Sequence, residues 1–143
     1  MSLYSERLAH LKKEIAIEKQ KRKKKKKKFT KNQQIMINFI NGVTKEAVFS
    51  IKGMRIVLRK GDEKKGFEHI LTKHYCNGCP GELGMLDILN FDLYLQRAIP
   101  LNQEGVSNTD LSVHQYIKGL QCYKIVLKEF DKGEFVVTFY SVG

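Results

Sequence analysis

The chain has 143 residues and carries 26 Lys and Arg against 15 Asp and Glu. This length fits one domain with an appendage. No apolar run approaches the roughly 20 residues that cross a bilayer, and the N-terminus lacks the apolar segment of a signal peptide. These features exclude a membrane-spanning protein and predict a cytoplasmic one.

Most of the positive charge lies near the N-terminus. Residues 1–30 hold 12 basic and 3 acidic side chains, a net charge of +9, whereas residues 31–143 hold 14 and 12, a net charge of +2. The sequence therefore predicts a basic arm over residues 1–30, helical or disordered, and a folded domain over residues 31–143.

The first half of the arm has the spacing of an amphipathic helix. Its apolar residues recur at steps of 4, 3 and 4, which places them on one helix face: Tyr4, Leu8, Leu11 and Ile15. This stripe predicts that the start of the arm docks on the domain.

The second half of the arm is a run of positive charge. Nine of the ten residues from Lys19 to Lys28 are Lys or Arg, so they repel one another and attract a polyanion. RNA or DNA phosphates are the expected ligands of Lys21, Arg22, Lys23, Lys24, Lys25, Lys26, Lys27 and Lys28. A solvated low-complexity tail is the alternative. An anionic membrane attracts the same charges and is the least favoured partner.

The domain begins with a helix followed by a hairpin. In "TKNQQIMINFING", Thr30 is suited to cap the helix start and Gly42 to follow its end. The runs "EAVFSI" and "MRIVLR" flank Lys52 and Gly53, a pattern typical of two strands joined by a tight turn.

The segment "KGFEHILTKHY", residues 65–75, is predicted to be a helix with one apolar face. Phe67, Ile70 and Leu71 form that face, and His74 continues it at i+7. A histidine at the edge of such a face is more often a packed, hydrogen-bonded residue than a catalyst. Both interpretations of His74 stay open.

His69 lies about 200° around this helix from Phe67, so packing of the apolar face does not explain it. Its neighbours four residues away are Lys65 and Lys73, whose charges disfavour the protonated imidazole and attract a phosphate. This is the local chemistry of a phosphodiester-cleaving site. An ordinary exposed histidine on a charged helix face is the alternative.

Three cysteines and no export signal predict reduced thiols rather than a disulfide framework. The spacing from His69 to Cys79 reads H-x4-H-x-C-x2-C, so a zinc knuckle is an alternative, with His69, His74, Cys76 and Cys79 as ligands. Against it, a five-residue step separates the histidines by about 140° on a regular helix, and only Cys122 remains for a second cysteine pair. A thioredoxin-type redox pair is disfavoured because no parallel βαβ pattern surrounds it. Plain loop cysteines remain.

The rest of the chain is predicted to form a second helix, a linker and a closing hairpin. The helix is "GMLDILNFDLYLQRA", the linker covers residues 100–110, and the strands "QCYKIVLKEF" and "EFVVTFYSV" surround an Asp and Gly turn. Together the elements predict an α+β fold in which N-terminal helices pack on a small antiparallel β-sheet.

The last strand is predicted to alternate between two faces with a period of two. One face suits the core and carries Phe135, Val137 and Phe139. The other carries Val136, Thr138 and Tyr140, so two hydroxyl groups are expected on one surface.

Four elements carry a resemblance: the strand "MRIVLRKG", the G-x-x-H-I-x-x-x-H pattern in "GFEHILTKH", a second helix after "GELG", and the closing hairpin that ends in "FVVTFYSV". Their order resembles the phage-associated branch of the barnase, EndoU, colicin and RelE-like (BECR) nuclease superfamily, over about residues 45–143. The resemblance implies a RelE-like nuclease fold and metal-independent endoribonuclease activity through attack of the RNA 2′-hydroxyl. No cofactor is expected. RNA is the expected partner, and a toxin-like role implies a neutralising protein partner.

The resemblance also implies roles for individual residues. His69 matches the first motif histidine and is the candidate base, and His74 matches the second. Arg59 and Lys65 lie close to the start of the helix and are candidate cations for the phosphate or the transition state.

The polar residues of the closing strand complete this candidate site. Tyr140 is expected to donate a proton or orient the phosphate, and Thr138 to donate a hydrogen bond to a non-bridging oxygen. The segment "CNGCPG" has no counterpart in the resemblance. A non-catalytic nucleic-acid-binding module with a polybasic arm is the alternative function, and the RNA target is not determined.

Overall fold

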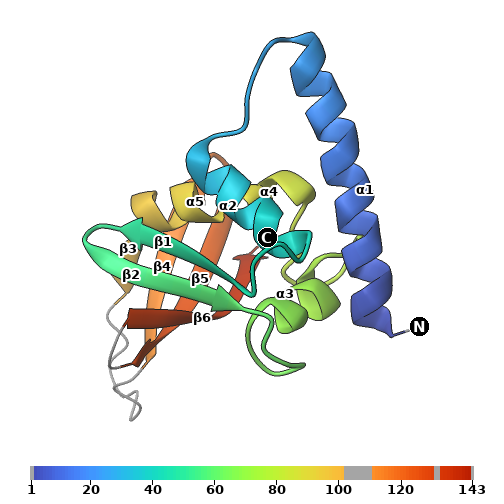
Figure 1. Cartoon of the computed structure of the whole chain (residues 1–143). Helices are drawn as coiled ribbons and strands as arrows, with labels where there is room; N and C mark the ends of the chain where they lie inside the picture. The colour runs from blue at the N-terminus through green and yellow to red at the C-terminus, as the bar shows by residue number, and fades with distance from the viewer. Residues whose placement is uncertain (1, 102–110, 131–132, 143) are drawn as a thin grey trace.

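The computed structural model describes residues 2–101, 111–130 and 133–142 and confirms the α+β prediction (Figure 1). The described helices are α1 (Leu3–Lys24), α2 (Lys31–Ile40), α3 (Phe67–His74), α4 (Met85–Leu89) and α5 (Phe91–Arg97). The described strands are β1 (Glu46–Ile51), β2 (Met54–Arg59), β3 (Ile99–Leu101), β4 (Leu111–Lys118), β5 (Gln121–Phe130) and β6 (Gly133–Val142). Within these ranges no helix has both the length and the apolar character to cross a bilayer.

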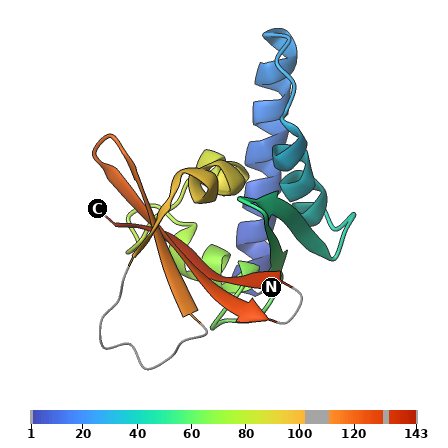
Figure 2. The same ribbon diagram turned by 90° about the vertical axis from the view of Figure 1, so that its left-hand side faces the viewer.

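All six strands belong to one sheet with the order β1-β2-β6-β5-β4-β3. Helices α2, α4 and α5 lie over one face of it, and Figure 2 shows the β5–β6 hairpin from the side. Every neighbouring pair is antiparallel except β2 and β6, which are parallel where Ile56 faces Glu134 and Val57 faces Phe135. The parallel pair forms because β6 arrives beside β2 only after the long crossover through α3, α4, α5 and the other strands.

The helix and the hairpin that begin the predicted domain form as expected. Thr30 caps α2 in a capping box: its hydroxyl accepts from the Gln33 backbone, and the Gln33 side chain accepts from the Thr30 backbone. Lys52 and Gly53 both have positive φ in the turn between β1 and β2, as a tight two-residue hairpin turn requires.

Three predictions in the second half of the chain are wrong in detail. The predicted second helix is two helices, broken at Asn90, whose side-chain oxygen accepts a hydrogen bond from the buried Gln33 side chain. Strand β4 was not predicted, because its core face carries polar residues such as Ser112 and His114 in place of an apolar alternation. The predicted linker over residues 100–110 begins too early, because residues 100 and 101 belong to β3. Residues 102–110 of the linker lie outside the described residues, as do residues 131 and 132 of the closing turn.

The start of the predicted arm is part of the hydrophobic core. Leu11 and Ile15 are buried, and Tyr4 and Leu8 pack against the same cluster, which confirms the apolar stripe. The Arg7 guanidinium donates to the backbone carbonyls of Leu71 and Thr72 near the end of α3. The N-terminal half of α1 is therefore joined to the rest of the protein, although the boundary at residue 30 stays a prediction.

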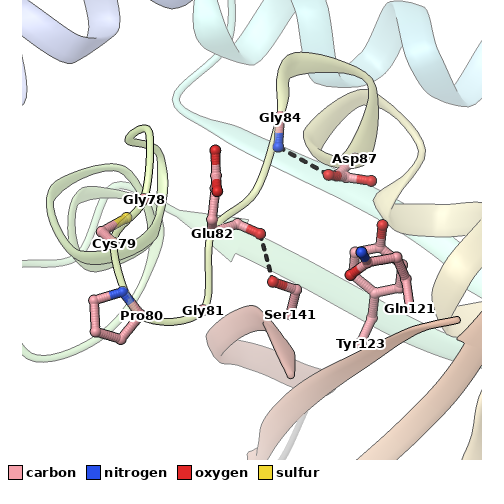
Figure 3. Close-up of a pocket in the computed structure, with 10 residues that line it drawn as sticks. All are labelled: Gly78, Cys79, Pro80, Gly81, Glu82, Gly84, Asp87, Gln121, Tyr123 and Ser141. Atoms are coloured by element: carbon pink, nitrogen blue, oxygen red, sulfur yellow. Dashed lines mark hydrogen bonds between the residues drawn. The ribbon is translucent and has the colours of Figure 1, made fainter. Parts of the chain in front are cut away.

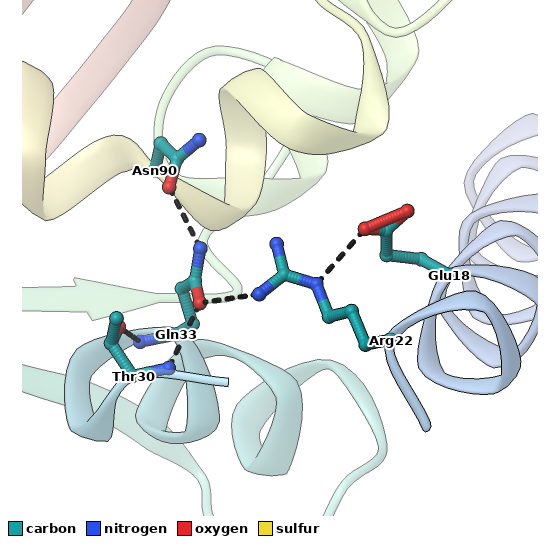
Figure 4. Close-up of polar contacts among 5 residues, drawn as sticks. All are labelled: Glu18, Arg22, Thr30, Gln33 and Asn90. Atoms are coloured by element: carbon teal, nitrogen blue, oxygen red, sulfur yellow. Dashed lines mark hydrogen bonds and ion pairs between the residues drawn. The ribbon is translucent and has the colours of Figure 1, made fainter. Parts of the chain in front are cut away.

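The far end of α1 is held by a polar cluster around Gln33 (Figure 4). Arg22 Nε donates to the Glu18 carboxylate at 2.9 Å, and its guanidinium reaches Gln33 at 3.5 Å and lies 4.5 Å from the centre of the Phe29 ring. Gln33 in turn donates to Asn90. This cluster ties α1, α2 and the α4–α5 junction together.

A β-bulge interrupts the pairing of β5 and β6. Leu127 pairs with Val136 and Val126 pairs with Thr138, so Val137 is an extra residue in β6. The strict alternation predicted for this strand is therefore wrong: Val136 is buried on the same core side as Phe139. The predicted core positions of Phe135 and Val137 lie outside the described side chains.

Candidate active site

The two histidines of α3 lie next to each other. Their ring centroids are 5.5 Å apart and the rings meet edge to face. A regular helix would separate positions 69 and 74 by about 140°. His74 is the last residue of α3, Tyr75 leaves the helical conformation with ψ 76°, and the following loop binds the His74 ring through the Pro80 carbonyl.

Each ring is oriented by a backbone carbonyl. His69 Nδ1 lies 2.8 Å from the Glu63 oxygen, and His74 Nδ1 lies 3.0 Å from the Pro80 oxygen. A carbonyl only accepts, so Nδ1 of each ring carries the hydrogen. In the neutral form of either ring, Nε2 is then the unprotonated nitrogen that can accept a proton.

The loop before α3 places the Glu63 carbonyl. Asp62 accepts hydrogen bonds from the backbone of Lys64 and Lys65, which lowers the pKa of its carboxyl, and its own backbone N–H donates to the Lys65 oxygen. Gly61 makes this turn possible, because a Cβ there would lie 2.1 Å from the Lys65 oxygen. The turn brings Glu63 back over the first turn of the helix.

His74 is half-buried, and burial lowers the pKa of its imidazole below the ordinary value. The nearby charges of His69 and Lys73 lower the pKa further, whereas the hydrogen bond to Pro80 raises it. His74 is thus neither a fully packed core residue nor a freely exposed one, and it is held in the form that can act as a base.

Of the two residues predicted to supply hydroxyls on β6, Tyr140 contacts His74 through its ring. Its ring stacks on His74 with centroids 5.5 Å apart and an interplanar angle of 29°. Thr138 Oγ1 is buried and makes no hydrogen bond within the described part of the chain. It does not reach the surface that a phosphate would contact.

The two predicted cations are Arg59 and Lys65. Arg59 Nε lies 2.5 Å from the Glu46 carboxylate, so this guanidinium is already engaged by an acid on β1. Lys65 is exposed directly before the start of α3. No hydrogen bond or ring contact joins Lys65 to either histidine in the part of the chain that the structure describes.

Sequence reasoning missed Lys124. It is the antiparallel partner of Tyr140, so its half-buried side chain lies on the same face of the sheet as the tyrosine ring. Counting back from the predicted turn without the bulge would pair Lys124 with Phe139 instead. The predicted hairpin therefore indicated the partner of Lys124 to within one residue of its actual partner, Tyr140.

The predicted nucleic-acid-binding residues lie at the other end of α1 from α3. Seven of the eight are exposed: Lys21, Lys23, Lys24, Lys25, Lys26, Lys27 and Lys28. Arg22 differs, because its side chain is held by Glu18, Gln33 and Phe29. From Arg7, which contacts α3, to Lys24 is 17 helical positions, about 25 Å along the axis.

Cys76 and Cys79 form a disulfide, contrary to the reduced thiols that the sequence predicted. The alternative zinc set is not assembled, because both sulfurs are bonded to each other and no cluster of metal-binding side chains occurs among the described residues. The spacing C-x2-C allowed a bond because its loop turns tightly, with Gly78 at positive φ. Cys122 is free.

A pocket of about 610 Å³ is lined by the loop that contains Gly81 and Glu82 (Figure 3). Asp87 lies on its wall and accepts hydrogen bonds from Tyr94 and from the Gly84 backbone. Burial and the nearby Asp87 raise the pKa of Tyr123, also on the wall, to about 12. The histidine rings do not line this pocket.

Comparisons with known proteins assign no family. No family model matches the chain, no curated protein matches its sequence, and no solved structure matches its fold.

Proposed function

We propose that this protein is a metal-independent endoribonuclease that cleaves RNA by attack of the 2′-hydroxyl on the adjacent phosphorus. The observation that carries the proposal is the histidine pair: two rings 5.5 Å apart, each with Nδ1 bound to a backbone carbonyl and Nε2 left for proton transfer. Such cleavage needs one base and one acid within reach of a single phosphodiester, and it needs no cofactor.

The surroundings of the rings suggest how the roles divide. His74 is the better base, because burial lowers its pKa and keeps it neutral. It takes the proton of the 2′-hydroxyl as the 2′-oxygen bonds to phosphorus. His69 is the candidate acid, which gives a proton to the departing 5′-oxygen. The products are a 2′,3′-cyclic phosphate and a free 5′-hydroxyl. The base role that the sequence predicted for His69 is thus assigned to His74, and His69 becomes the acid.

Neighbouring residues would support the charged transition state. Lys124 and Lys65 are the candidate cations for the extra negative charge on phosphorus, and Tyr140 would orient the phosphate beside His74. Arg59 is a weaker candidate because it is paired with Glu46. Thr138 is left out of the mechanism, because its hydroxyl is buried.

The exposed lysines of residues 21–28 would bind the RNA backbone away from the cleaved bond. About 25 Å of helix α1 separates Lys24 from Arg7, which contacts α3, so one RNA strand that contacts both the lysines and the histidines has to be several nucleotides long. The proposal includes the BECR, RelE-like relationship, a phage-associated or toxin-like role with a neutralising protein partner, and action in the cytoplasm. The basic segment from Lys19 to Lys28, called the lysine run below, also favours the second candidate, a nucleic-acid-binding module that does not cleave.

The decisive experiment is incubation of the purified chain with a mixed-length RNA in EDTA, followed by analysis of the fragment ends. We expect 2′,3′-cyclic phosphate ends, no cleavage of RNA methylated at every 2′-oxygen, and a loss of roughly 100- to 10,000-fold in His69→Ala and in His74→Ala. His10→Ala is the matched control, because His10 is an exposed histidine on α1. Binding of RNA without any cleavage would establish the non-catalytic module instead.

A further inference from the structure

The segment from Cys76 to Leu83, here called the cysteine loop, enters the mechanism above only through the Pro80 carbonyl that binds His74 Nδ1. It connects α3 to α4 and is closed near its start by the Cys76–Cys79 disulfide. Its sequence contains Gly78, Gly81 and one of the chain's two prolines, so its path is set by backbone geometry more than by side-chain packing.

The cysteine loop is tied to its neighbours at its far end. Leu83 donates its backbone N–H to the His74 carbonyl at 2.8 Å. Ser141 of β6 donates twice. Its backbone N–H donates to the Gly81 oxygen at 3.2 Å. Its hydroxyl donates to the Glu82 oxygen at 2.5 Å, as Figure 3 shows. Together with the disulfide, these bonds fix both ends of the short stretch through Pro80 and Gly81.

This fixed stretch lies against the histidine site. The Pro80 carbonyl accepts the hydrogen of His74 Nδ1. At Gly81, which has φ +72°, a Cβ would lie 2.6 Å from His74 Nδ1 and 2.9 Å from the Tyr140 Cβ. No other residue type fits there without moving the histidine ring, so the loop and the ring are in direct steric contact.

We infer that the cysteine loop is a positioning element that holds His74 in one place and one tautomer, with Nε2 free to accept a proton. The disulfide keeps the Pro80 carbonyl aimed at Nδ1, and the bare backbone of Gly81 lets the loop close onto the ring. The catalytic consequence rests on the proposed nuclease function. The position and tautomer of His74 do not.

The inference gives the loop a defined effect on the chemistry of the ring. Charged and titratable groups close to His74 are His69 and Lys73 on α3 and Tyr140 on β6. None of them comes from the cysteine loop, which contributes a carbonyl acceptor and shielding from water. Opening the loop should therefore hydrate the ring and raise the pKa of His74 toward its ordinary value, because burial is the main cause of the lowering.

The chain supplies a matched pair of substitutions. Gly81→Ala and Gly78→Ala both place a side chain at positive φ in the same loop, +72° and +75°. Only the first meets the ring, since nothing lies within 4 Å of a Cβ at Gly78. Backbone strain should affect both variants alike, so a difference between them reports the contact with His74.

The test follows the ring nitrogens of His74 by NMR in the full-length ¹⁵N-labelled protein, with His74→Gln to assign the signals. We expect a single Nδ1–H tautomer in the wild type and in Gly78→Ala, and mixed tautomers with a higher His74 pKa in Gly81→Ala. Cys76→Ser should shift the ring in the same direction, and it serves as the second variant if Gly81→Ala does not fold. An unchanged ring in Gly81→Ala, or an equal change in Gly78→Ala, would overturn the inference.

Cleavage is then measured on the same proteins. We expect Gly81→Ala to lose about 100-fold in kcat with little change in KM, the effect of misplacing a catalytic group by about 1 Å. If the wild type does not cut RNA, the proposed function fails, while the NMR comparison still decides whether the loop positions His74. Full cleavage by a Gly81→Ala protein with mixed tautomers would overturn the catalytic part alone.

Discussion

His74 makes three different contacts with its ring: an edge-to-face histidine, a stacked tyrosine and a carbonyl on Nδ1. The proposed cleavage depends on which ring nitrogen of His74 is free and on whether the ring is neutral. Burial favours the neutral ring, because it lowers the pKa of His74.

The pH dependence of cleavage should show this lowered pKa. A base must be neutral to act, so kcat/KM should fall as the pH drops through the pKa of His74. Because that pKa lies below the ordinary 6.5, we expect the acidic limb to have its midpoint below 6.5, and half-maximal rate to persist at a pH where a free imidazole is mostly protonated. A midpoint above 6.5 would mean that His74 is not the base.

Thr138 allows a test of stability independent of function. Its hydroxyl is buried without a hydrogen bond, which costs about 1–3 kcal/mol, so Thr138→Val should raise the free energy of unfolding by about 1 kcal/mol and Tm by roughly 3–5 °C. Cleavage should be unchanged. Thr72→Val is the control, because Thr72 Oγ1 donates to the Glu68 carbonyl and removal of this hydrogen bond should destabilise the protein. Loss of RNA cleavage in Thr138→Val would return Thr138 to the mechanism.

At the scale of whole elements, two features decide where the site forms. The bulge at Val137 turns Tyr140 toward Lys124 and His74 while keeping Phe139 in the core. Helix α1 buttresses α3 from outside: Arg7 bonds to its last turn, and Tyr75 donates to Glu14 of α1. Burial and the Glu14 carboxylate raise the pKa of Tyr75 far above its ordinary value, which keeps this donor protonated.

Docking of α1 can be measured with two substitutions on the same helix. Leu11 is fully buried and Ile17 is 57% exposed. Leu11→Ala should lower the free energy of unfolding by about 2–5 kcal/mol, and Ile17→Ala by no more than about 0.5 kcal/mol, as followed by urea denaturation. Equal, small effects would show that α1 is not docked in solution. For the same reason, deletion of residues 1–28 would remove part of the core along with the basic charge.

At the scale of the whole molecule, charge and chemistry lie at different places. The histidine site is beside the N-terminal half of α1, whereas the lysine run follows its C-terminal half, held in place by the Arg22 cluster (Figure 4). Separate positions would allow the proposed RNA binding and the proposed cleavage to be changed independently.

Neutralising the lysine run should weaken binding without unfolding the protein. Replacement of the six residues from Lys23 to Lys28 by Gln should lower RNA affinity and flatten its salt dependence, by about 0.7–0.9 in the log–log slope for each phosphate that a lysine no longer neutralises. Two double variants serve as a matched pair, because each removes two positive charges. Lys27→Gln/Lys28→Gln removes them inside the lysine run, and Lys12→Gln/Lys13→Gln removes them outside it. A slope that is unchanged in the six-residue variant would place the binding surface elsewhere.

Features that depend on near neighbours could be predicted from the sequence. The cap at Thr30, the turn at Lys52 and Gly53, the apolar stripes of α1 and α3 and the segregated charge all follow from residues within a few positions of one another. The histidine motif was found in the same way, including the position of His69 off the apolar face of α3.

The residues that make up the site come together through contacts between distant segments. The periodicity of a helix or strand does not predict such contacts. Pro80 and Gly81 meet His74 through a loop closed by a disulfide, and Tyr140 joins them from a strand some 60 residues later. The bulge shifts the β5–β6 register by one residue, which places Tyr140 beside Lys124 and leaves the Thr138 hydroxyl buried. One extra backbone residue changes the face of every later side chain in a strand, so sheet pairing and packing, and not the order of residues, assembled this site.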